Sequence, residues 1–552
     1  MNLRAVGRLL GIVLLLMAGF LLVPVLVAII AGEERAGWAF FMSSVVSALT
    51  GFGMAWMNKG SAYSKEGRPD YFRREGLAVV GLAWLIGSVA GALPYLFGGT
   101  FDSFVDAFFE SASGLSTTGS TVMSPEGIDG MPKAIAFWRS FTHWLGGFGI
   151  VMVFVVLFPT GGRSLFRSEI PGISREAGHQ RVRDSAIALM RIYVGISALE
   201  FVLLWVAGMT PFDSLLHTFG TIATGGFSNH SSSVAYFSSV PIEMIITFFM
   251  FMCGFNFAIY DTLLRVGLRP AWRSFIGSTE AKAYLGITVG ATLLIAVVLW
   301  FWGGDNGLSV EPLPERFGQA VVTELPLEYR ELVQDELPPM YATTVVAELP
   351  AEYRRLLGFD PLPDYRQFLQ ALRDSVFQVV CMSTSTGYGT ADFDRWPQVC
   401  RVLLMLLAVT GACAGSTGGG IKVVRMLIVA KAALNGVRRF VRPRAIHSVR
   451  MDGQMLDEGI VASVTGYFAL WTFVFMGGTL FLSAYKIDPV SAATGVLATL
   501  NNIGPGLHMF GPAMNYAELP DPCKLLLSLF MILGRLEFYA VVALFVPSFW
   551  RR

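Results

Sequence analysis

Ser116-Thr117-Thr118-Gly119-Ser120 is the first of four short glycine-bearing stretches that decide the fold. The others are Ala223-Thr224-Gly225-Gly226-Phe227, Ser385-Thr386-Gly387-Tyr388-Gly389 and Asn501-Asn502-Ile503-Gly504-Pro505-Gly506. Each follows a helix-like segment that is too short to cross a bilayer: 101–115, 211–223, 367–383 and 488–500. We expect these segments to be re-entrant helices, with amphipathic surface helices as the alternative. Backbone that turns back inside a membrane is tolerated where it lines water, so the four predict a shared aqueous path.

The four stretches share a sequence register. An aspartate stands thirteen residues before a glycine in three of them, in the pairs Asp106 and Gly119, Asp213 and Gly226, and Asp374 and Gly387. The fourth differs, because Ser491 holds that position before Gly504, and Asp488 stands three residues earlier, where it can cap the helix. A helix, a short helix, a glycine turn and a second helix therefore occur four times.

The composition is that of a membrane protein. Of the 552 residues, 54% are apolar and 15% are charged, and the mean hydropathy is +0.57. Apolar runs of spanning length predict about ten transmembrane helices, at 7–31, 38–57, 76–98, 134–159, 186–209, 239–262, 284–302, 398–431, 459–484 and 522–548. A net charge of only +1 argues against a nucleic-acid partner. The five cysteines form no C-x-x-C pair, so we expect no metal centre built from them.

Positive charge is concentrated in alternate loops, which indicates the orientation. Lys and Arg gather at 59–74, 163–183, 265–273 and 438–450, and the chain closes on two arginines. Both termini are therefore predicted to be cytoplasmic. We expect an all-α membrane protein with four pseudo-symmetric repeats of helix, pore helix, filter and helix around one pore. The predicted boundaries are 1–75 for a two-helix N-terminal leader, then 76–183, 184–282, 283–457 and 458–552 for the repeats.

Repeat three carries a predicted external insert at 304–366. It holds twelve acidic residues against five arginines and a duplicated phrase that begins at Val321 and again at Val345. Two interpretations stay open: an acidic vestibule that concentrates cations, or a solvated cap over the entrance.

The glycine turns fit the chemistry of a dehydrated cation. Rings of backbone carbonyls replace a hydration shell without placing a full negative charge in the membrane, and glycine permits the backbone that directs carbonyls at one axis. The third stretch is close to the T-V-G-Y-G filter of potassium channels and the other three are not, so we expect potassium preference with imperfect exclusion of sodium. The predicted filter residues are Thr117, Thr118, Gly119, Thr224, Gly225, Gly226, Ser385, Thr386, Gly387, Asn502, Ile503 and Gly504.

Two features inside apolar segments suggest a gate. Ala414-Gly415-Ser416-Thr417-Gly418-Gly419-Gly420-Ile421-Lys422 interrupts the run at 398–431, so the helix is expected to break near Gly411 to Gly420. A movable loop and a static kink are both possible there. Arg535 lies in the last apolar run, and a charge in a membrane helix usually faces a cavity or a partner. The alternative is a structural ion pair with Glu537 or a more distant acid.

The motifs resemble those of the Trk/Ktr/HKT superfamily of cation transporters, and among them the bacterial Trk-type potassium uptake pore subunits. The resemblance rests on Gly114 to Thr121, Ala223 to Ser228, Thr384 to Gly389, Leu500 to Gly506, Trp144 to Gly149, Ala414 to Lys422 and Gly534 to Glu537. It covers nearly the whole chain apart from 304–366.

The resemblance implies gated, potassium-selective uptake across the bacterial plasma (inner) membrane, with potassium as the substrate and no covalently bound cofactor. It implies an intramembrane loop that plugs the pore and a positive barrier at Arg535. The gating residues are then Gly411, Gly415, Ser416, Thr417, Gly418, Gly419, Gly420 and Arg535. It also implies a homodimer in the lipid bilayer and a cytosolic ring of nucleotide-binding, TrkA-like regulator subunits, which would carry the only nucleotide.

Other classes of function remain as alternatives. A sodium-permeable or sodium-coupled member of the same superfamily is the nearest, and channel-like conduction and proton- or sodium-coupled transport are both open. An intramembrane enzyme is more remote. His143 is the one histidine well inside a predicted helix, and the chain has neither a G-x-S-x-G elbow nor an H-E-x-x-H zinc helix.

Overall fold

The computed structural model describes the chain except for residues 59–72, 158–178, 303–367, 443–447, 537 and 551–552. The insert predicted at 304–366 and the possible ion-pair partner Glu537 lie outside the described residues. The described chain forms two compact units. One comprises Met1–Val289, Phe377–Asp392 and Leu404–Arg552, and the other comprises Gly290–Val376 and Phe393–Leu403. All four glycine turns belong to the first unit.

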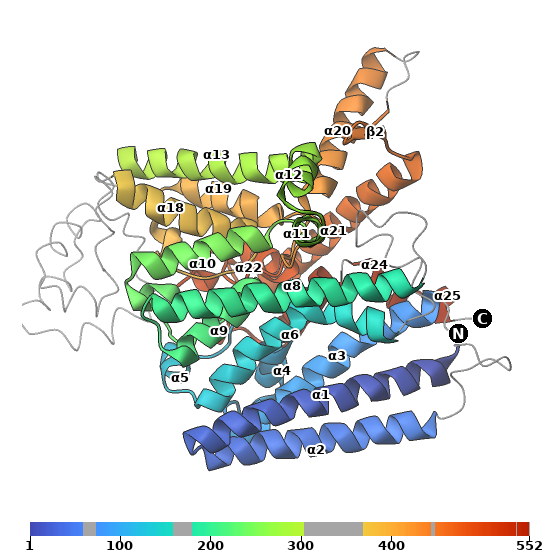
Figure 1. The fold of residues 1–552 in the computed structure, drawn as a ribbon, viewed down its shortest axis with the longest axis vertical. Helices are drawn as coiled ribbons and strands as arrows, with labels where there is room; N and C mark the ends of the chain where they lie inside the picture. Colours follow the sequence, from blue (N-terminus) through green and yellow to red (C-terminus); the bar gives the residue numbers. More distant parts are fainter. Residues whose placement is uncertain (59–72, 158–178, 303–367, 443–447, 537, 551–552) are drawn as a thin grey trace, which may run out of the picture. The chain divides into compact units, whose positions relative to one another are not determined.

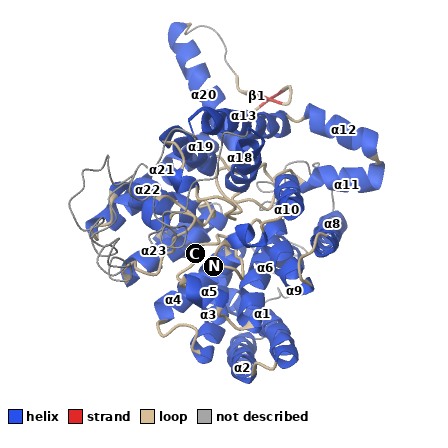
Figure 2. Cartoon of the chain, turned by 90° about the vertical axis from the view of Figure 1, so that its left-hand side faces the viewer, coloured by secondary structure: helices blue, strands red, loops and turns tan. Residues whose placement is uncertain are grey.

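The protein is almost wholly helical (Figure 2). The longer helices are α1 Leu3–Ala31, α2 Glu34–Met57, α3 Arg73–Gly98, α6 Lys133–Leu157, α8 His179–Val206, α10 Val240–Cys253, α11 Phe257–Val266, α12 Leu268–Gly277, α13 Thr279–Trp302, α19 Gln398–Val409, α20 Val423–Val441, α21 Glu458–Ala484 and α23 Asp521–Arg535. Within the described residues, six helices are long and apolar enough to cross a membrane, or seven if a bent pair counts as one span. The count of ten spans stays a prediction.

The first two helices pack as an antiparallel pair, α1 against α2 (Figure 1). Gly11 and Gly51 face each other across this pair, and a Cβ added to either would come within 3.0 Å of the partner's backbone. Small residues let membrane helices approach this closely, because association in lipid depends on van der Waals packing. A core of buried side chains that includes Phe40, Tyr95 and Trp138 joins this pair to the helices behind it.

Four short helices occupy the predicted re-entrant segments. They are α4 Phe104–Leu115, α9 Pro211–Ile222, α18 Phe368–Ser383 and α22 Pro489–Leu500. Three begin with a side-chain cap, in which Ser103, Thr210 and Asp488 each accept a hydrogen bond from a first-turn N–H. The cap predicted at Asp488 is confirmed, with Oδ1 accepting from the amides of Val490 at 3.1 Å and Ser491 at 2.9 Å.

Three predicted spans need comment. The run at 398–431 is broken as expected, because α19 ends at Val409 and α20 begins at Val423. The predicted span at 239–262 is bent, because α10 and α11 meet at 91°. Asn256 has an extended backbone and caps α11 through its side chain, so the chain starts a new helix there.

The helix predicted to run to 548 is also shorter than expected. α23 ends at Arg535, and short turns of helix follow at α24 Tyr539–Val542 and α25 Pro547–Trp550. Phe538 has a φ of 59° and its N–H bonds to the Leu533 carbonyl, which closes α23 with a left-handed residue. Arg535 therefore lies at the end of a helix rather than deep within one.

A hairpin of two short strands precedes α21. β1 Arg450–Met451 pairs antiparallel with β2 Gln454–Met455. Asp452 and Gly453 form its turn with φ values of 50° and 79°, the left-handed pair that tight two-residue hairpin turns require.

Candidate functional site

Each of the four short helices ends in the same backbone motif. The second residue after the helix is left-handed in every copy: Thr117 at φ 57°, Thr224 at 55°, Ser385 at 58° and Asn502 at 55°. Its N–H bonds three residues back, and the next N–H bonds five residues back, in Thr118 to Ser113, Gly225 to Gly220, Thr386 to Cys381 and Ile503 to Ala498. This is the Schellman closure of a helix, and it stops each helix at the same depth relative to its glycine.

The left-handed position is normally taken by glycine, yet these four residues all carry a Cβ. A left-handed residue with a side chain costs roughly 1–2 kcal/mol. Such strain persists only where the surroundings hold it, and it gathers at functional sites. Two residues further on, Gly119, Gly226, Gly387 and Gly504 are left-handed as well, with φ from 79° to 100°. Within three residues, each turn therefore passes from a left-handed residue through one that is not left-handed to a left-handed glycine.

The four turns close into a ring. A Cβ placed on each glycine would come within 3.0 Å of one carbonyl oxygen of the next turn. The order is Gly119 to the Gly225 oxygen, Gly226 to the Thr386 oxygen, Gly387 to the Ile503 oxygen, and Gly504 back to the Thr118 oxygen. Each of these oxygens belongs to the residue just before the neighbouring glycine. The structure thus brings all twelve predicted filter residues together and makes the four glycines equivalent.

Most carbonyls of the ring have no hydrogen-bond donor among the described residues. Within the described part of the chain, the carbonyls of Thr118, Gly225, Thr386 and Ile503 accept no hydrogen bond, and neither do those of three of the four ring glycines. Buried carbonyls are almost always satisfied in proteins. The fourth glycine differs, because Gly504 accepts from Ser120 Oγ at 3.1 Å and from the Tyr516 hydroxyl at 2.9 Å. The ring therefore presents an asymmetric set of free oxygen acceptors.

Most hydroxyls at the turns serve the scaffold. Thr118 Oγ1 lies 2.6 Å from Ser116 Oγ, and Thr386 Oγ1 lies 2.8 Å from Thr384 Oγ1. Asn502 joins two turns, because its amide donates to Thr118 Oγ1 at 2.9 Å and to the Met531 carbonyl at 2.8 Å. The side chains thus hold the backbone in place, and the backbone provides the free acceptors.

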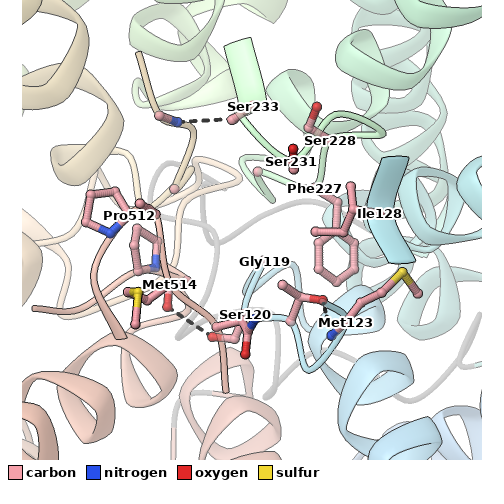
Figure 3. Close-up of a pocket in the computed structure, with 18 of the residues that line it drawn as sticks. Gly119, Ser120, Met123, Ile128, Phe227, Ser228, Ser231, Ser233, Pro512 and Met514 are labelled. Atoms are coloured by element: carbon pink, nitrogen blue, oxygen red, sulfur yellow. Dashed lines mark hydrogen bonds between the residues drawn. The ribbon is translucent and has the colours of Figure 1, made fainter. Parts of the chain in front are cut away.

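A polar pocket opens at one end of the ring. It is lined by residues of every turn, including Gly119, Phe227, Gly387 and Pro505, and by the segment from Phe510 to Tyr516. Figure 3 shows Ser120 and Met123 on one side of it, Phe227 and Ser228 on another, and Pro512 and Met514 facing them. This pocket adjoins the ring glycines, and we call it the vestibule.

A carboxylate stands beside this vestibule. Asp129, in α5 Pro125–Asp129, accepts from the N–H of Ser231 at 2.8 Å and from its Oγ at 2.6 Å. These hydrogen bonds hold the pKa of Asp129 below its usual range, so the group stays negatively charged as the pH falls to its ordinary pKa. A fixed negative charge at the mouth raises the local concentration of cations.

The predicted gating loop lies at the other end of the ring. The Gly419 N–H donates to Ser385 Oγ at 2.6 Å. A Cβ on Gly418 would come within 3.0 Å of the Thr384 carbonyl oxygen, and one on Gly419 would come equally close to the Asn501 oxygen. The loop therefore abuts turns three and four from the side opposite the vestibule.

Arg535 contacts the loop directly. Its Nη1 donates to the Thr417 carbonyl at 2.7 Å, and its Nη2 donates to the Gly146 carbonyl of α6 at 2.9 Å. The guanidinium therefore ties the loop to a helix of the first repeat. Both of these hydrogen bonds go to carbonyls, and the possible pairing with Glu537 falls on a residue outside the described chain.

A buried ion pair behind the first two turns was not identified from the sequence. Arg139 of α6 and Glu110 of α4 are 2% and 0% exposed, and their N–O distance is 2.8 Å. Arg139 also donates to the Ser228 carbonyl at 3.0 Å, and Glu110 accepts from the Val122 N–H at 3.1 Å. A charged residue inside the predicted span at 134–159 was the available signal. The pair fixes the segments that follow the first two ring glycines.

His143 also has a structural place. Its Nε2 accepts from the Phe227 N–H at 3.3 Å, and its ring lies 4.3 Å from the Phe227 ring. This contact supports the second turn from behind. No group of three or more His, Cys, Asp or Glu side chains that could hold a metal occurs among the described residues.

Fold and site together define a helical membrane protein in which the turns after four short helices form one ring of carbonyl oxygens. Residues 41–330 and 362–552 match the TrkH family of cation transport proteins. The chain is 33% identical to the Trk system potassium uptake protein TrkH of Salmonella typhimurium over the full length of both, and 28% identical to TrkG of Escherichia coli over 100% and 99%. The crystal structure of the potassium transporter TrkH from Vibrio parahaemolyticus superimposes with a TM-score of 0.78 at 31% identity, covering both chains completely.

The chain belongs to the TrkH family. This is a family of transport proteins rather than of enzymes, so the intramembrane-enzyme alternative is set aside.

The buried ion pair yields a prediction about stability. Glu110→Ala leaves the Arg139 guanidinium buried without its carboxylate, which we expect to lower the free energy of unfolding by about 3–5 kcal/mol. Glu110→Leu combined with Arg139→Met removes both charges and should recover much of that loss. Denaturant unfolding in detergent, followed by tryptophan fluorescence, measures both changes.

The exposed pair of Asp261 and Arg265, 2.6 Å apart, provides the control. Asp261→Ala should cost less than about 1 kcal/mol. A Glu110→Ala protein as stable as the Asp261→Ala protein would contradict the structural role of the pair.

Proposed function

We propose that this chain takes up potassium across the bacterial plasma membrane through the ring of four turns. The observation that carries the proposal is the ring of carbonyl oxygens that accept no hydrogen bond in the described chain. Oxygens left without donors in a buried site suit an ion that must lose its water. The relatives named as potassium uptake proteins support potassium as the ion.

The electrostatics favour a monovalent cation. Four short helices end at the ring, and the carbonyl end of each carries about half a negative charge. The twelve proposed filter residues include no acidic side chain, so the negative potential comes from dipoles and not from full charges. A divalent ion, which takes carboxylate ligands in most sites, is poorly served by this set. Sodium permeation remains the alternative function, because the four turns differ in sequence. In addition, the Gly504 carbonyl already accepts two hydrogen bonds, so the ring is not symmetric.

We also propose that the loop at 411–420 closes the conduction path beneath the ring. Its contacts with Ser385 and with Arg535 support this role. Arg535 then acts twice: its hydrogen bond anchors the loop, and its positive charge opposes cation passage.

Membership of the family is the basis for our proposal about the quaternary assembly. We expect a homodimer in the inner membrane, with both termini in the cytoplasm and a ring of TrkA-like, nucleotide-binding subunits on that side. The clusters of Lys and Arg at 265–273 and 438–450 support this orientation. The cytosolic subunits would then move the loop.

Filter geometry gives the first functional prediction. Gly226→Ser adds a side chain that would overlap the Thr386 carbonyl, at a backbone φ of 79° that disfavours any Cβ. The displaced oxygens should discriminate less between ions, and we expect the K⁺/Na⁺ permeability ratio to fall several-fold. Isotope flux of ⁸⁶Rb⁺ and ²²Na⁺ in proteoliposomes measures the ratio.

Gly119→Ser, Gly387→Ser and Gly504→Ser should behave alike. Gly195→Ser in α8 is the matched control, because a Cβ there meets open space. If all four ring variants keep the wild-type ratio, the filter assignment is wrong. Wild-type vesicles that carry Na⁺ as fast as Rb⁺ would favour the sodium-permeable alternative.

The gate gives the second functional prediction. Arg535→Ala and removal of Ser416 to Gly419 should each raise the basal Rb⁺ flux without any regulator, and the two together should raise it more than either. Arg535→Lys keeps the positive charge but loses the planar fork that reaches two carbonyls, so it should free the loop and keep the charge barrier. We expect its flux to lie between wild type and Arg535→Ala.

Arg438→Ala, on the exposed surface of α20, is the control for loss of an arginine. Equal flux in the wild type, in both single variants and in the double variant, at matched protein incorporation, would place the gate elsewhere.

A further inference from the structure

The two ends of the gating loop meet at one carboxylate that the filter and Arg535 do not involve. Glu280, in the first turn of α13, accepts from the Ala414 N–H at 2.7 Å and from the Val424 N–H at 3.1 Å, both through Oε1. Ala414 stands near the start of the loop, and Val424 stands just after its end. A single charged oxygen therefore holds both ends of the loop together, with hydrogen bonds of the stronger, charge-assisted kind.

Backbone hydrogen bonds also join the two ends of the loop, which we call the neck. The Gly411 N–H bonds to the Ile421 carbonyl at 2.8 Å, and the Val423 N–H bonds to the Ala412 carbonyl at 3.3 Å. Glu280 is thus the acidic side chain that clasps this neck. Lys422, which donates to the Gly418 carbonyl inside the loop, adds a favourable charge near the same carboxylate.

The clasp is connected to the β1–β2 hairpin. Asp452, at the turn of the hairpin, accepts from the N–H of Thr279, the residue next to Glu280, at 2.7 Å. The other side of the hairpin is tied to α20, because Lys431 Nζ donates to the Arg450 carbonyl at 2.8 Å. The hairpin therefore holds the beginning of α13 and the helix that leaves the loop, which are the two elements that meet at Glu280.

We propose that Glu280 is a gate-positioning residue that holds the loop closed. We further propose that Asp452, in the cytosolic hairpin, controls the position of the loop through Glu280. The inference rests on the proposed function, since it assigns a control point to the proposed gate. Displacement of the hairpin draws Thr279 and Glu280 away from the neck, which releases both ends of the loop in one step. The ring is untouched by this movement, so opening changes the rate of flux and leaves ion selectivity unchanged.

The first test is basal Rb⁺ flux in proteoliposomes of the full chain without regulator. We expect Glu280→Ala to raise it about five- to tenfold with an unchanged K⁺/Na⁺ ratio. Glu280→Gln keeps an acceptor oxygen but loses the charge, and it should raise flux about two- to threefold. Asp452→Ala, at an exposed position of the hairpin turn, removes the acceptor for the Thr279 N–H and should give a similar small rise. Glu458→Ala, an exposed glutamate at the start of α21, is the control and should leave flux at the wild-type level.

The double variant separates this inference from a merely structural role. If Asp452 acts through Glu280, then Glu280→Ala with Asp452→Ala should match Glu280→Ala alone. Flux in the double variant that exceeds the single by the full Asp452→Ala factor would overturn the coupling. A K⁺/Na⁺ ratio that falls with Glu280→Ala would overturn the proposal. Wild-type flux in both Glu280→Gln and Asp452→Ala would also overturn it, and this test does not need the Glu280→Ala protein.

A second measurement does not depend on transport. Cys413 lies in the loop neck and is 1% exposed, and Cys523 of α23 is fully buried away from the neck. N-ethylmaleimide labelling in detergent, resolved by site with mass spectrometry, should become several-fold faster at Cys413 in Glu280→Ala and stay unchanged at Cys523. Unchanged labelling of Cys413 would refute the clasp. If neither the wild-type protein nor the variant without Ser416 to Gly419 carries Rb⁺, the proposed function is refuted, whatever the labelling shows.

Discussion

The structure depends on one constraint, which is that a ring of buried carbonyl oxygens must be kept free of hydrogen-bond donors. A folding chain ordinarily satisfies such groups with helix, sheet or water. Here each short helix is stopped by a Schellman closure, and the following residues reverse hand twice, so no further N–H can reach the ring oxygens. Leaving these acceptors unpaired costs free energy in the protein alone. In the proposed function, a cation replaces the missing donors and offsets that cost.

The surrounding helices hold this strained backbone by different means in different turns. The first two turns rest on the Glu110–Arg139 pair, and the second also rests on His143. The fourth turn is held by Asn502, which bonds both to the first turn and to the end of α23. The backbone of the four turns is nearly the same, whereas the side chains that support it are not. What the four turns share is therefore the carbonyl geometry and not a repeated sequence.

Features of the fold that depend on local sequence signals could be predicted from the sequence. The bounds of α4, α9, α18 and α22 agree with expectation to within three residues, because each combines an apolar stretch with a glycine turn, and three of them also have a side-chain cap. The register of aspartates correctly selected Gly226 over Gly225 as the equivalent glycine, as the ring contacts demonstrate.

Features set by tertiary contact were missed or misjudged. The bend between α10 and α11 lies in a continuous apolar run, and nothing in its periodicity marks Asn256 as a cap. The end of α23 at Arg535 and the Glu110–Arg139 pair depend on neighbours that are distant in sequence. The left-handed conformation of Thr117 and its counterparts runs against local propensity, so no propensity argument could have found it.

The loop differs from the ring in its hydrogen bonding, and this difference bears on how a gate can open. The loop's Thr417 and Gly418 carbonyls are satisfied by the side chains of Arg535 and Lys422, and its ends are held by Glu280. Because these two carbonyls are already hydrogen-bonded, they are not free to act as ligands for a cation. Four of the loop's hydrogen bonds come from charged side chains, and the others are isolated bonds rather than a helix ladder. Releasing them is therefore a local event, which leaves α19 and α20 intact and costs far less than unwinding either helix would.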